Sequence, residues 1–179
     1  MGFTELWIPN ETLNRLRELV ASVQSVPGGI MEIGVWEGRS FVQIAEAAHP
    51  RKAHAVDHFM GSSTDGAITG EVAQQRDIYQ SFIGNTAHLD NVVVHRMDSD
   101  AFMEMWNEPV AFAHIDAHHS YESVKRQIEW ILPKLSPGAV LCGDDYSQRW
   151  PGVVQAVDEL LPGASVEQFM WIYQNEQEN

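Results

Sequence analysis

The sequence has one cysteine and no long hydrophobic run. Cys142 has no partner for an intrachain disulfide, which suits a reducing, cytoplasmic compartment. Because it lies in an apolar run, we expect a buried and unreactive thiol rather than a nucleophile. No apolar stretch is long enough to cross a bilayer, and the first residues lack the basic and hydrophobic regions of a secretory signal. We therefore expect a soluble protein with no membrane partner.

Positive charge is also scarce. The 179 residues include 25 acids against 11 lysines and arginines, for a formal net charge of −14. Such a field repels nucleic-acid phosphates and anionic lipid headgroups. The composition therefore argues against nucleic acid and membrane surfaces as partners and leaves a small molecule as the expected ligand.

The chain reads as one domain over residues 1–179, with no internal repeat and no separating linker. Residues 1–28 form an N-terminal helical segment, and residues 58–70, dense in Gly, Ser, Thr and Asp, predict a mobile lid loop. Apolar runs alternate with helical patterns through the rest of the chain. Strands are expected at 30–33, 52–56, 92–94, 111–115 and 139–142 and within 166–173, and helices at 13–23, 39–48, 71–88, 100–106, after Ser120, and at 153–161.

This alternation predicts an α/β fold, a mainly parallel, doubly wound sheet with helices on both faces. Such sheets bind ligands outside the carboxyl ends of their strands. An acidic residue lies at or beside nearly every predicted strand end. These acids are Glu32, Asp57, Asp98, Asp116, Asp144 and Asp145.

A turn with two glycines follows the first predicted strand. Gly34 and Gly38 permit tight turns and a close backbone approach to a ligand. Their spacing is not that of a dinucleotide fingerprint, and Trp36 and Glu37 crowd the place of a pyrophosphate. Because Glu32 and Glu37 flank the turn, it suits a cationic ligand better than a polyanion. The alternative is a structural turn with a chance carboxylate.

Two further strand ends suit a nucleoside. Asp57 ends the second strand about twenty residues beyond the turn, where Rossmann-type folds place an acid on the ribose hydroxyls. Asp98 and Ser99 follow the third strand, where they either hold an adenine amine or begin the helix near Asp100, with Asp98 as its N-cap.

Three aspartates follow the fourth and fifth strands, which are neighbours in such a sheet. Asp116, Asp144 and Asp145 cannot all stay ionised at close range without a compensating cation. Oxygen ligands favour Mg²⁺, with Mn²⁺ or Ca²⁺ as alternatives, over zinc. The competing interpretation is that Asp144 and Asp145 only start a turn or cap a helix. His119 is a candidate general base, because imidazole suits proton removal near neutral pH.

Over essentially its whole length the chain resembles the class I S-adenosylmethionine (SAM)-dependent methyltransferases, and most of all the small bacterial group with the macrocin-type, metal-dependent sugar O-methyltransferases. The resemblance lies in the segments MEIGVWEGRS at 31–40, AVDHF at 55–59, HIDAHHSYE at 114–122, LSPGAV at 135–140 and GDDY at 143–146. One departure is Ala139, where that group usually has a second glycine.

The resemblance implies a Rossmann-like sheet of seven strands, a SAM site, a divalent-cation site and a catalytic pair. The pair is His119 and Asp116, and the cation ligands are Asp116, Asp144 and Asp145. The residues implied for SAM are Glu32, Gly34, Trp36, Gly38, Ser40, Asp57, His58, Asp98, Ser99 and Asp116.

These features together predict a metal-dependent O-methyltransferase acting on a small hydroxylated acceptor, such as a sugar, a polyol or a catechol-like molecule. Two alternatives stay open at this point. One is a catalytically inactive SAM-binding or scaffold domain, and the other is a nicotinamide-dependent Rossmann oxidoreductase, which the missing dinucleotide glycines disfavour. A homodimer is compatible with the short chain.

Overall fold

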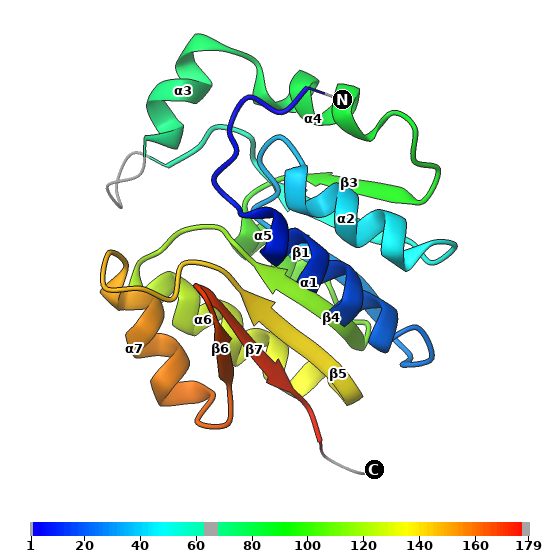
Figure 1. Cartoon of the computed structure of the whole chain (residues 1–179), viewed down its shortest axis with the longest axis vertical. Helices are drawn as coiled ribbons and strands as arrows, with labels where there is room; N and C mark the ends of the chain where they lie inside the picture. The colour runs from blue at the N-terminus through cyan, green and yellow to red at the C-terminus, as the bar shows by residue number, and fades with distance from the viewer. Residues whose placement is uncertain (1, 63–67, 177–179) are drawn as a thin grey trace.

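A seven-stranded sheet runs through the computed structural model, which describes residues 2–62 and 68–176 (Figure 1). The strand order is β3-β2-β1-β4-β5-β7-β6; β7 is antiparallel to both its neighbours, and the other neighbours are parallel. The strands are β1 (Gly29–Ile33), β2 (Ala53–Asp57), β3 (Val92–Arg96), β4 (Val110–Ile115), β5 (Leu135–Gly143), β6 (Ser165–Glu167) and β7 (Met170–Gln174). The predicted Rossmann-like, mainly parallel sheet of seven strands is confirmed.

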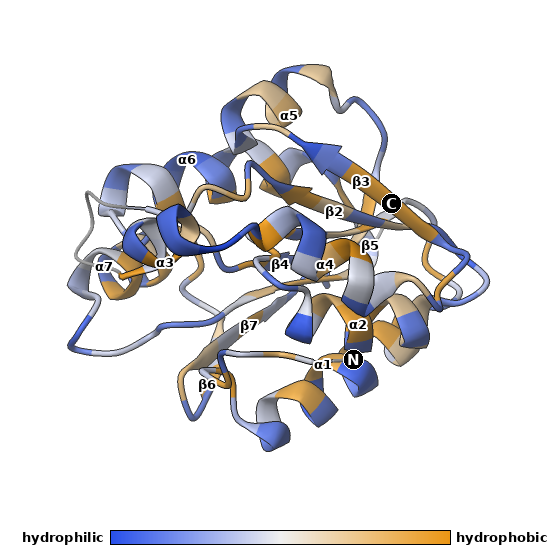
Figure 2. Ribbon diagram, turned by 90° about the horizontal axis from the view of Figure 1, so that it is seen from above, coloured by the Kyte–Doolittle hydropathy of each residue, from blue (hydrophilic) through white to orange (hydrophobic). Residues whose placement is uncertain are grey.

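Helices cover both faces of this sheet, as Figure 2 shows for α1 and α2 on one side and α5 and α6 on the other. Alternate side chains of β1 enter separate cores: Ile30 packs with α1, α2 and α4, whereas Met31 and Ile33 pack with α5, α6 and α7. Strands buried on both faces require such apolar runs. The helices are α1 (Asn10–Ser22), α2 (Arg39–Ala48), α3 (Thr69–Gln75), α4 (Ile78–Thr86), α5 (Ser99–Met105), α6 (Tyr121–Ile131) and α7 (Pro151–Leu160).

The prediction of one helix over residues 71–88 is wrong. The chain forms α3 and α4 instead, because Arg76 has an extended backbone and Asp77 caps a new helix. The Asp77 carboxylate accepts a hydrogen bond from the Gln80 amide at 3.0 Å. An N-cap aspartate satisfies an amide that the first helical turn leaves unpaired, so it favours a fresh start over a continuous helix.

Several local predictions are confirmed. Ser120 caps α6 by accepting from the Ser123 amide, and Cys142 is fully buried, with burial raising the pKa of its thiol.

Within the described residues, no helix is both long and apolar enough to cross a membrane. The predicted lid over 58–70 includes residues 63–67, which lie outside the described residues, so the lid stays a prediction.

Two histidines stack on adjacent strands at the β3 edge of the sheet. The His54 and His95 ring centroids are 5.3 Å apart, and their nearest ring nitrogens are 3.0 Å apart. Trp106 packs edge-on against His54 at 4.7 Å. Burial, reinforced by the charge that His95 would carry, lowers the pKa of His54 to about 4. The folded protein therefore holds this imidazole neutral.

This histidine pair is expected to weaken the fold in mild acid. The pKa of His54 is about 4 in the folded state against 6.5 for the free side chain. The neutral imidazole therefore makes its full contribution to the free energy of unfolding above pH 6.5, and this contribution is lost as the pH falls from 6.5 to 4. The free energy of unfolding, measured by urea titration, should therefore fall less over this interval in His54→Gln than in the wild type. His88→Gln, at an exposed imidazole, serves as the control. Equal pH dependence in His54→Gln and the wild type would contradict the prediction.

Candidate functional site

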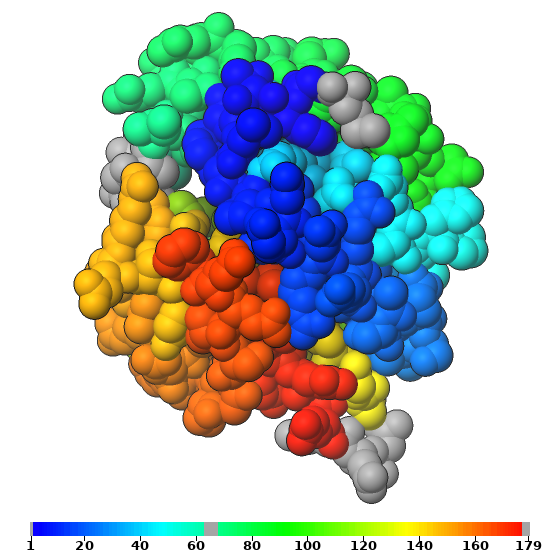
Figure 3. Space-filling model, viewed as in Figure 1, coloured from blue at the N-terminus to red at the C-terminus, as the bar shows by residue number. Residues whose placement is uncertain are grey.

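The carboxyl ends of the parallel strands open onto a cleft with a volume of about 1240 Å³. Figure 3 shows the surface hollowed between the N-terminal segment, the chain that leads into α7 and the β6–β7 hairpin. Pockets that hold one drug-sized ligand usually measure about 300–1,000 Å³. This cleft therefore has room for a nucleoside cofactor together with a small acceptor.

Gly34 lies where β1, β2 and β4 converge beneath the cleft. Its amide donates to the Val56 carbonyl at 2.8 Å, and the Asp116 amide donates to the Ile33 carbonyl at 2.8 Å. Gly34 has φ +92°, and a Cβ there would lie 2.0 Å from the Asp116 carbonyl oxygen. Only glycine fits so close an approach with a left-handed backbone.

Asp57 is held rigidly at the end of β2. Its two carboxylate oxygens accept from the backbone amides of Trp36 at 2.9 Å and Phe59 at 2.6 Å. Both partners have positive φ, 48° and 62°, a strained backbone that tends to mark functional sites. A carboxylate offers about four acceptor positions, so Asp57 keeps two for hydroxyl donors in the cleft that it lines.

Two residues predicted to bind the cofactor, Glu32 and Gly38, are not among the described residues that line the cleft. Glu32 is fully buried beside its register partner His114, whose Nδ1 lies 2.7 Å from the carboxylate, and it accepts from the Ser40 hydroxyl at 2.6 Å. Burial alone lowers the pKa of His114, but the bond to Glu32 outweighs it and raises that pKa. Gly38 begins α2 with φ +86° and leaves space for the Phe82 ring. Ser40, by contrast, does line the cleft.

The remaining predicted cofactor residues also line the cleft; they are Trp36, His58, Asp98, Ser99 and Asp116. Asp98 also caps α5 by accepting from the Asp100 amide at 2.9 Å, so the capping interpretation is confirmed. The adenine contact stays a prediction, because a capping carboxylate retains free lone pairs. The Nδ1 atom of His58 accepts from the Met60 amide at 3.0 Å.

A cluster of possible metal ligands lies beside this region of the cleft. Single ligand atoms of Asp116, His119 and Asp145 all lie within 4.8 Å of one another. The His119 Nε2 atom is 2.8 Å from an Asp145 oxygen, and Trp150 stacks on the His119 ring at 4.1 Å. Asp144 also lines the cleft, but its carboxylate accepts from the Asp145 amide and is not part of this group.

The electrostatics of this cluster favour a cation. Burial, followed by the charge of Asp144, raises the pKa of Asp116 to about 8. Burial likewise raises the pKa of Asp144. Carboxylates crowded in this way hold their protons unless a positive charge compensates them. The donor set of two carboxylates and an imidazole therefore fits a divalent metal ion.

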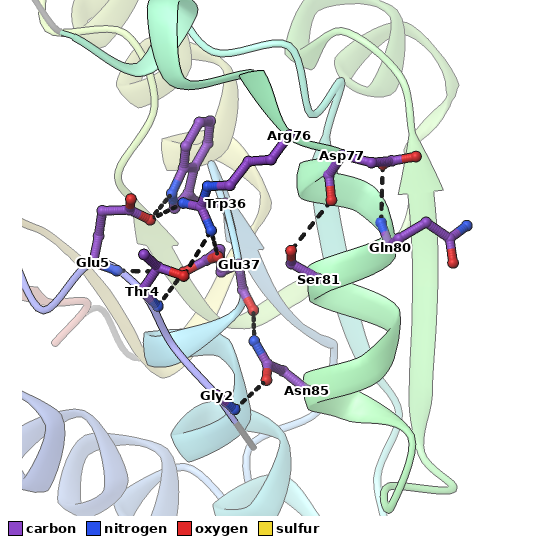
Figure 4. A network of polar contacts seen from close by, with 10 residues as sticks. All are labelled: Gly2, Thr4, Glu5, Trp36, Glu37, Arg76, Asp77, Gln80, Ser81 and Asn85. Carbon is purple, nitrogen blue, oxygen red and sulfur yellow. Dashed lines mark hydrogen bonds and ion pairs between the residues drawn. The ribbon is translucent and has the colours of Figure 1, made fainter. Parts of the chain in front are cut away.

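An N-terminal strap, residues 2–8, borders the other end of the cleft. Figure 4 shows the polar contacts that hold this strap. The Thr4 amide donates to the Glu37 carboxylate at 2.8 Å, and the Trp36 indole donates to Glu5 at 3.1 Å. Arg76, in the break between α3 and α4, bridges Glu5 and Glu37. The strap is thereby tied to the turn after β1.

The Glu37 carboxylate is therefore already paired with a cation, the guanidinium group of Arg76. Burial raises the pKa of this carboxyl, but the Thr4 amide and Arg76 together outweigh burial and leave the pKa lowered. The sequence-based suggestion that Glu37 favours a cationic ligand is therefore replaced by an internal ion pair.

Sequence reasoning also missed much of the outer part of the cleft. Trp7, Ile68 and Phe169 line it, yet they lie far apart in the chain and form no pattern with one another. Tyr121 and Tyr146, which border the predicted metal site in sequence, are not among the lining residues, because their hydroxyls donate to Glu159 and Asp158 of α7.

Comparison with known proteins yields one matching family model and many similar structures. The model, described as a methyltransferase domain, matches residues 31–146. No curated protein sequence matches the chain.

Three of the similar solved structures illustrate the likeness. The O-methyltransferase NovP is 22% identical, with a TM-score of 0.70 over 93% of this chain and 80% of its own. CalS11, a TDP-rhamnose 3'-O-methyltransferase of calicheamicin biosynthesis, is 22% identical, with a TM-score of 0.65 over 92% and 79%. TomG from Streptomyces achromogenes, an O-methyltransferase solved with SAM, is 17% identical, with a TM-score of 0.67 over 97% and 83%. At these identities the likeness establishes the fold.

Proposed function

Because the chain belongs to the methyltransferase-domain family, as a class I SAM-dependent enzyme, we propose that it methylates an oxygen atom of a small hydroxylated acceptor with the help of a divalent cation. The acceptor class is a sugar, a polyol or a catechol-like molecule. The observation that carries this proposal is the convergence of Asp116, His119 and Asp145 beside the cleft. The O-methyltransferases of the same fold are consistent with transfer to oxygen.

The inner part of the cleft suits SAM. Asp57 has acceptor positions for ribose hydroxyls. Asp98 and Ser99 line the same cleft and would hold the adenine amine, and Gly34 and Asp116 line it as well. SAM supplies an electrophilic methyl group on a positively charged sulfur. The carboxylates on this wall would stabilise that charge and the α-ammonium group.

The acidic cluster suits a cation that binds the acceptor oxygens. A divalent ion there would polarise an acceptor hydroxyl and lower its pKa. We assign the ion to Asp116, His119 and Asp145, with Asp144 beside them; the sequence-based set was Asp116, Asp144 and Asp145. An imidazole ligand favours Mn²⁺ over Mg²⁺ and Ca²⁺, since the latter two prefer oxygen alone.

This assignment leaves the predicted base role of His119 in competition with a ligand role. One imidazole nitrogen cannot bind a metal and accept a proton at the same time, and Nε2 is the atom that faces Asp145. As a ligand, His119 predicts that His119→Gln loses metal affinity; as a base, it predicts that the same variant keeps metal affinity and loses turnover. The Trp150 ring stacked on His119 fixes the imidazole in either role.

The chain's own contribution to the reaction is positioning and exclusion of water. Methyl transfer is an in-line displacement, in which the acceptor oxygen forms a bond to the methyl carbon as the carbon–sulfur bond breaks. Reactants held in the correct geometry gain much of the rate acceleration without further chemistry. The strand-end residues Asp57 and Asp116 lie on elements pinned through Gly34, so the two binding regions have a fixed separation.

Calorimetry tests the proposed cofactor. SAM is expected to bind with a Kd in the micromolar to millimolar range, and NAD is expected not to bind. Asp57→Asn should weaken SAM binding about tenfold, because a charged hydrogen-bond acceptor contributes roughly 1.5 kcal/mol or more. Asp90→Asn, at a carboxylate with an 83% exposed side chain, should change nothing.

Turnover separates an active enzyme from an inactive binding domain. With Mn²⁺ and a panel of diols, an enzyme releases S-adenosylhomocysteine, whereas a scaffold domain binds SAM and releases none. Failure of the wild type to bind SAM or S-adenosylhomocysteine would exclude the proposal altogether.

A further inference from the structure

Three exposed hydrophobic side chains line the cleft. Trp7 of the strap is 53% exposed, Ile68 before α3 is 58% exposed, and Phe169 in the β6–β7 turn is 56% exposed. We call these three residues the apolar rim. Isolated exposed hydrophobics need no explanation, but three that line one cleft form a candidate binding surface. Here three segments distant in sequence bring them to the cleft that contains the acidic cluster.

The rim is mainly aromatic. Trp7 lies 6.0 Å from Trp36, ring centroid to ring centroid, with the planes tilted by 35°. Phe169 adds a further ring, and its neighbour Met170 is buried in the core and anchors that turn. Flat, rigid rings bind other aromatic groups at a small cost in conformational entropy. The surface therefore matches a planar aryl group better than a flexible, hydrated one.

The charge around the acceptor end is strongly negative. The carboxylates of Asp116, Glu122, Asp144 and Asp145 line this cleft. A divalent ion would offset two of these charges and leave an excess. A negative field of this kind lowers the local concentration of anionic ligands.

The basic side chains of the cleft do not reverse this field. No lysine is among the described lining residues, and two of the three arginines have internal partners. Arg126 pairs with Asp100, and Arg39 binds Asn10 and a backbone carbonyl. Arg149 lies over the Trp150 ring. Diphosphate recognition often uses bidentate arginines or a glycine-rich turn free of acids, and the described residues of this cleft form neither arrangement.

We propose that the acceptor carries an uncharged aryl group, which packs on the apolar rim of Trp7, Ile68 and Phe169 while its hydroxyl reaches the acidic cluster. The acceptor is therefore a free aromatic diol or an aryl glycoside, and not a nucleoside-diphosphate sugar or a phosphorylated metabolite. This inference rests on the proposed function, because it assumes that the acidic cluster binds the reacting hydroxyl.

A matched set of catechols tests the inference. The protein, loaded with S-adenosylhomocysteine and Mn²⁺, is titrated in a calorimeter with catechol, 4-phenylcatechol, 3,4-dihydroxybenzoate and UDP-glucose. We expect 4-phenylcatechol to bind at least about tenfold more tightly than catechol, because burial of an aromatic ring contributes at least that factor. The two anionic probes should bind more weakly than catechol. Equal affinities for the two neutral catechols, no binding of 4-phenylcatechol, or tighter binding of either anion would overturn the inference.

Substitutions in the apolar rim test whether its side chains cause the tighter binding of 4-phenylcatechol. Trp7→Ala and Phe169→Ala should each remove most of the phenyl advantage and weaken the binding of catechol by a smaller factor. Leu6→Ala and Val166→Ala are the matched controls, since these side chains are 67% and 42% exposed, neighbour the rim in sequence and are not among the lining residues. Both controls should keep the full advantage, and an equal loss in rim and control variants would contradict the assignment.

The titrations and the turnover assay together separate the two levels of the proposal. A wild type that does not bind S-adenosylhomocysteine refutes the proposed function itself. A wild type that binds it and turns over diols without preferring aryl groups refutes only the inference about the rim.

Discussion

Asp145→Asn is expected to abolish metal-stimulated turnover, with a loss of at least about 100-fold, because a metal ion contributes several kcal/mol to the stabilisation of developing charge. SAM affinity should stay within about twofold, since Asp145 follows β5 while the nucleoside residues follow β1 to β3. The measurement is S-adenosylhomocysteine release at saturating SAM, as a function of Mn²⁺ concentration.

Asparagine is chosen because it removes the charge of Asp145 without straining the backbone. Asp145 has φ +67°, and asparagine is one of the few residues that tolerates this left-handed conformation. The substitution also preserves the size of the side chain while it removes the charge. Any loss of metal affinity therefore comes from the missing carboxylate and not from backbone strain.

Two further measurements complete this experiment. Direct Mn²⁺ binding, by calorimetry or electron paramagnetic resonance, should weaken in Asp145→Asn in step with turnover, while Asp90→Asn behaves as the wild type. Full activity of the wild type after treatment with a chelator would refute the metal-dependent mechanism. Full activity of Asp145→Asn in the presence of metal would refute the ligand assignment.

Gly34→Ala is expected to lower the free energy of unfolding by roughly 3 kcal/mol or more, which is a large fraction of the stability of an ordinary domain. A Cβ at this position would lie 2.0 Å from the Asp116 carbonyl oxygen, and the backbone φ of +92° is unfavourable for alanine. Relief of the contact requires β1 and β4 to separate at their carboxyl ends, where the candidate site lies. Urea denaturation followed by circular dichroism measures the effect.

The matched control is another glycine-to-alanine change with the opposite expected sign. Gly84 lies within α4, and nothing lies within 4 Å of the position that a Cβ would take. Alanine there should stabilise the protein by about 0.5–1 kcal/mol, because it restricts the unfolded chain and favours a helix. Wild-type stability in Gly34→Ala would contradict the close approach of the two strands, whereas an insoluble Gly34→Ala beside a soluble Gly84→Ala would support it.

The predictable part of the site is the part that depends on strand ends. Asp57, Asp98 and Asp116 line the cleft as expected, because parallel strands place their carboxyl ends along one edge of the sheet. The position of a residue at a strand end does not by itself tell whether its side chain is buried in the core or faces the cleft. Glu32 lies only one residue before the end of β1, yet it is fully buried against His114.

The break between α3 and α4 at Arg76 shows a second feature that the sequence pattern alone did not predict. The apolar spacing over 71–88 is compatible with one helix, and only the cap at Asp77 divides it. That break places Arg76 between Glu5 and Glu37 and so fixes the strap. The ion pairs join residues up to 71 positions apart, and no local pattern encodes such a contact.

The sequence by itself determined the fold class and the edge of the sheet onto which the cleft opens, because hydrophobic periodicity and strand-end carboxylates are local properties of the chain. Only the tertiary structure decided which of these carboxylates reach the cleft. It selected His119 in place of Asp144 for the group around Asp116 and Asp145, and it assembled the apolar rim from three separate segments. These outcomes depend on distances between side chains remote in sequence, which packing of the whole chain sets and no segment specifies alone.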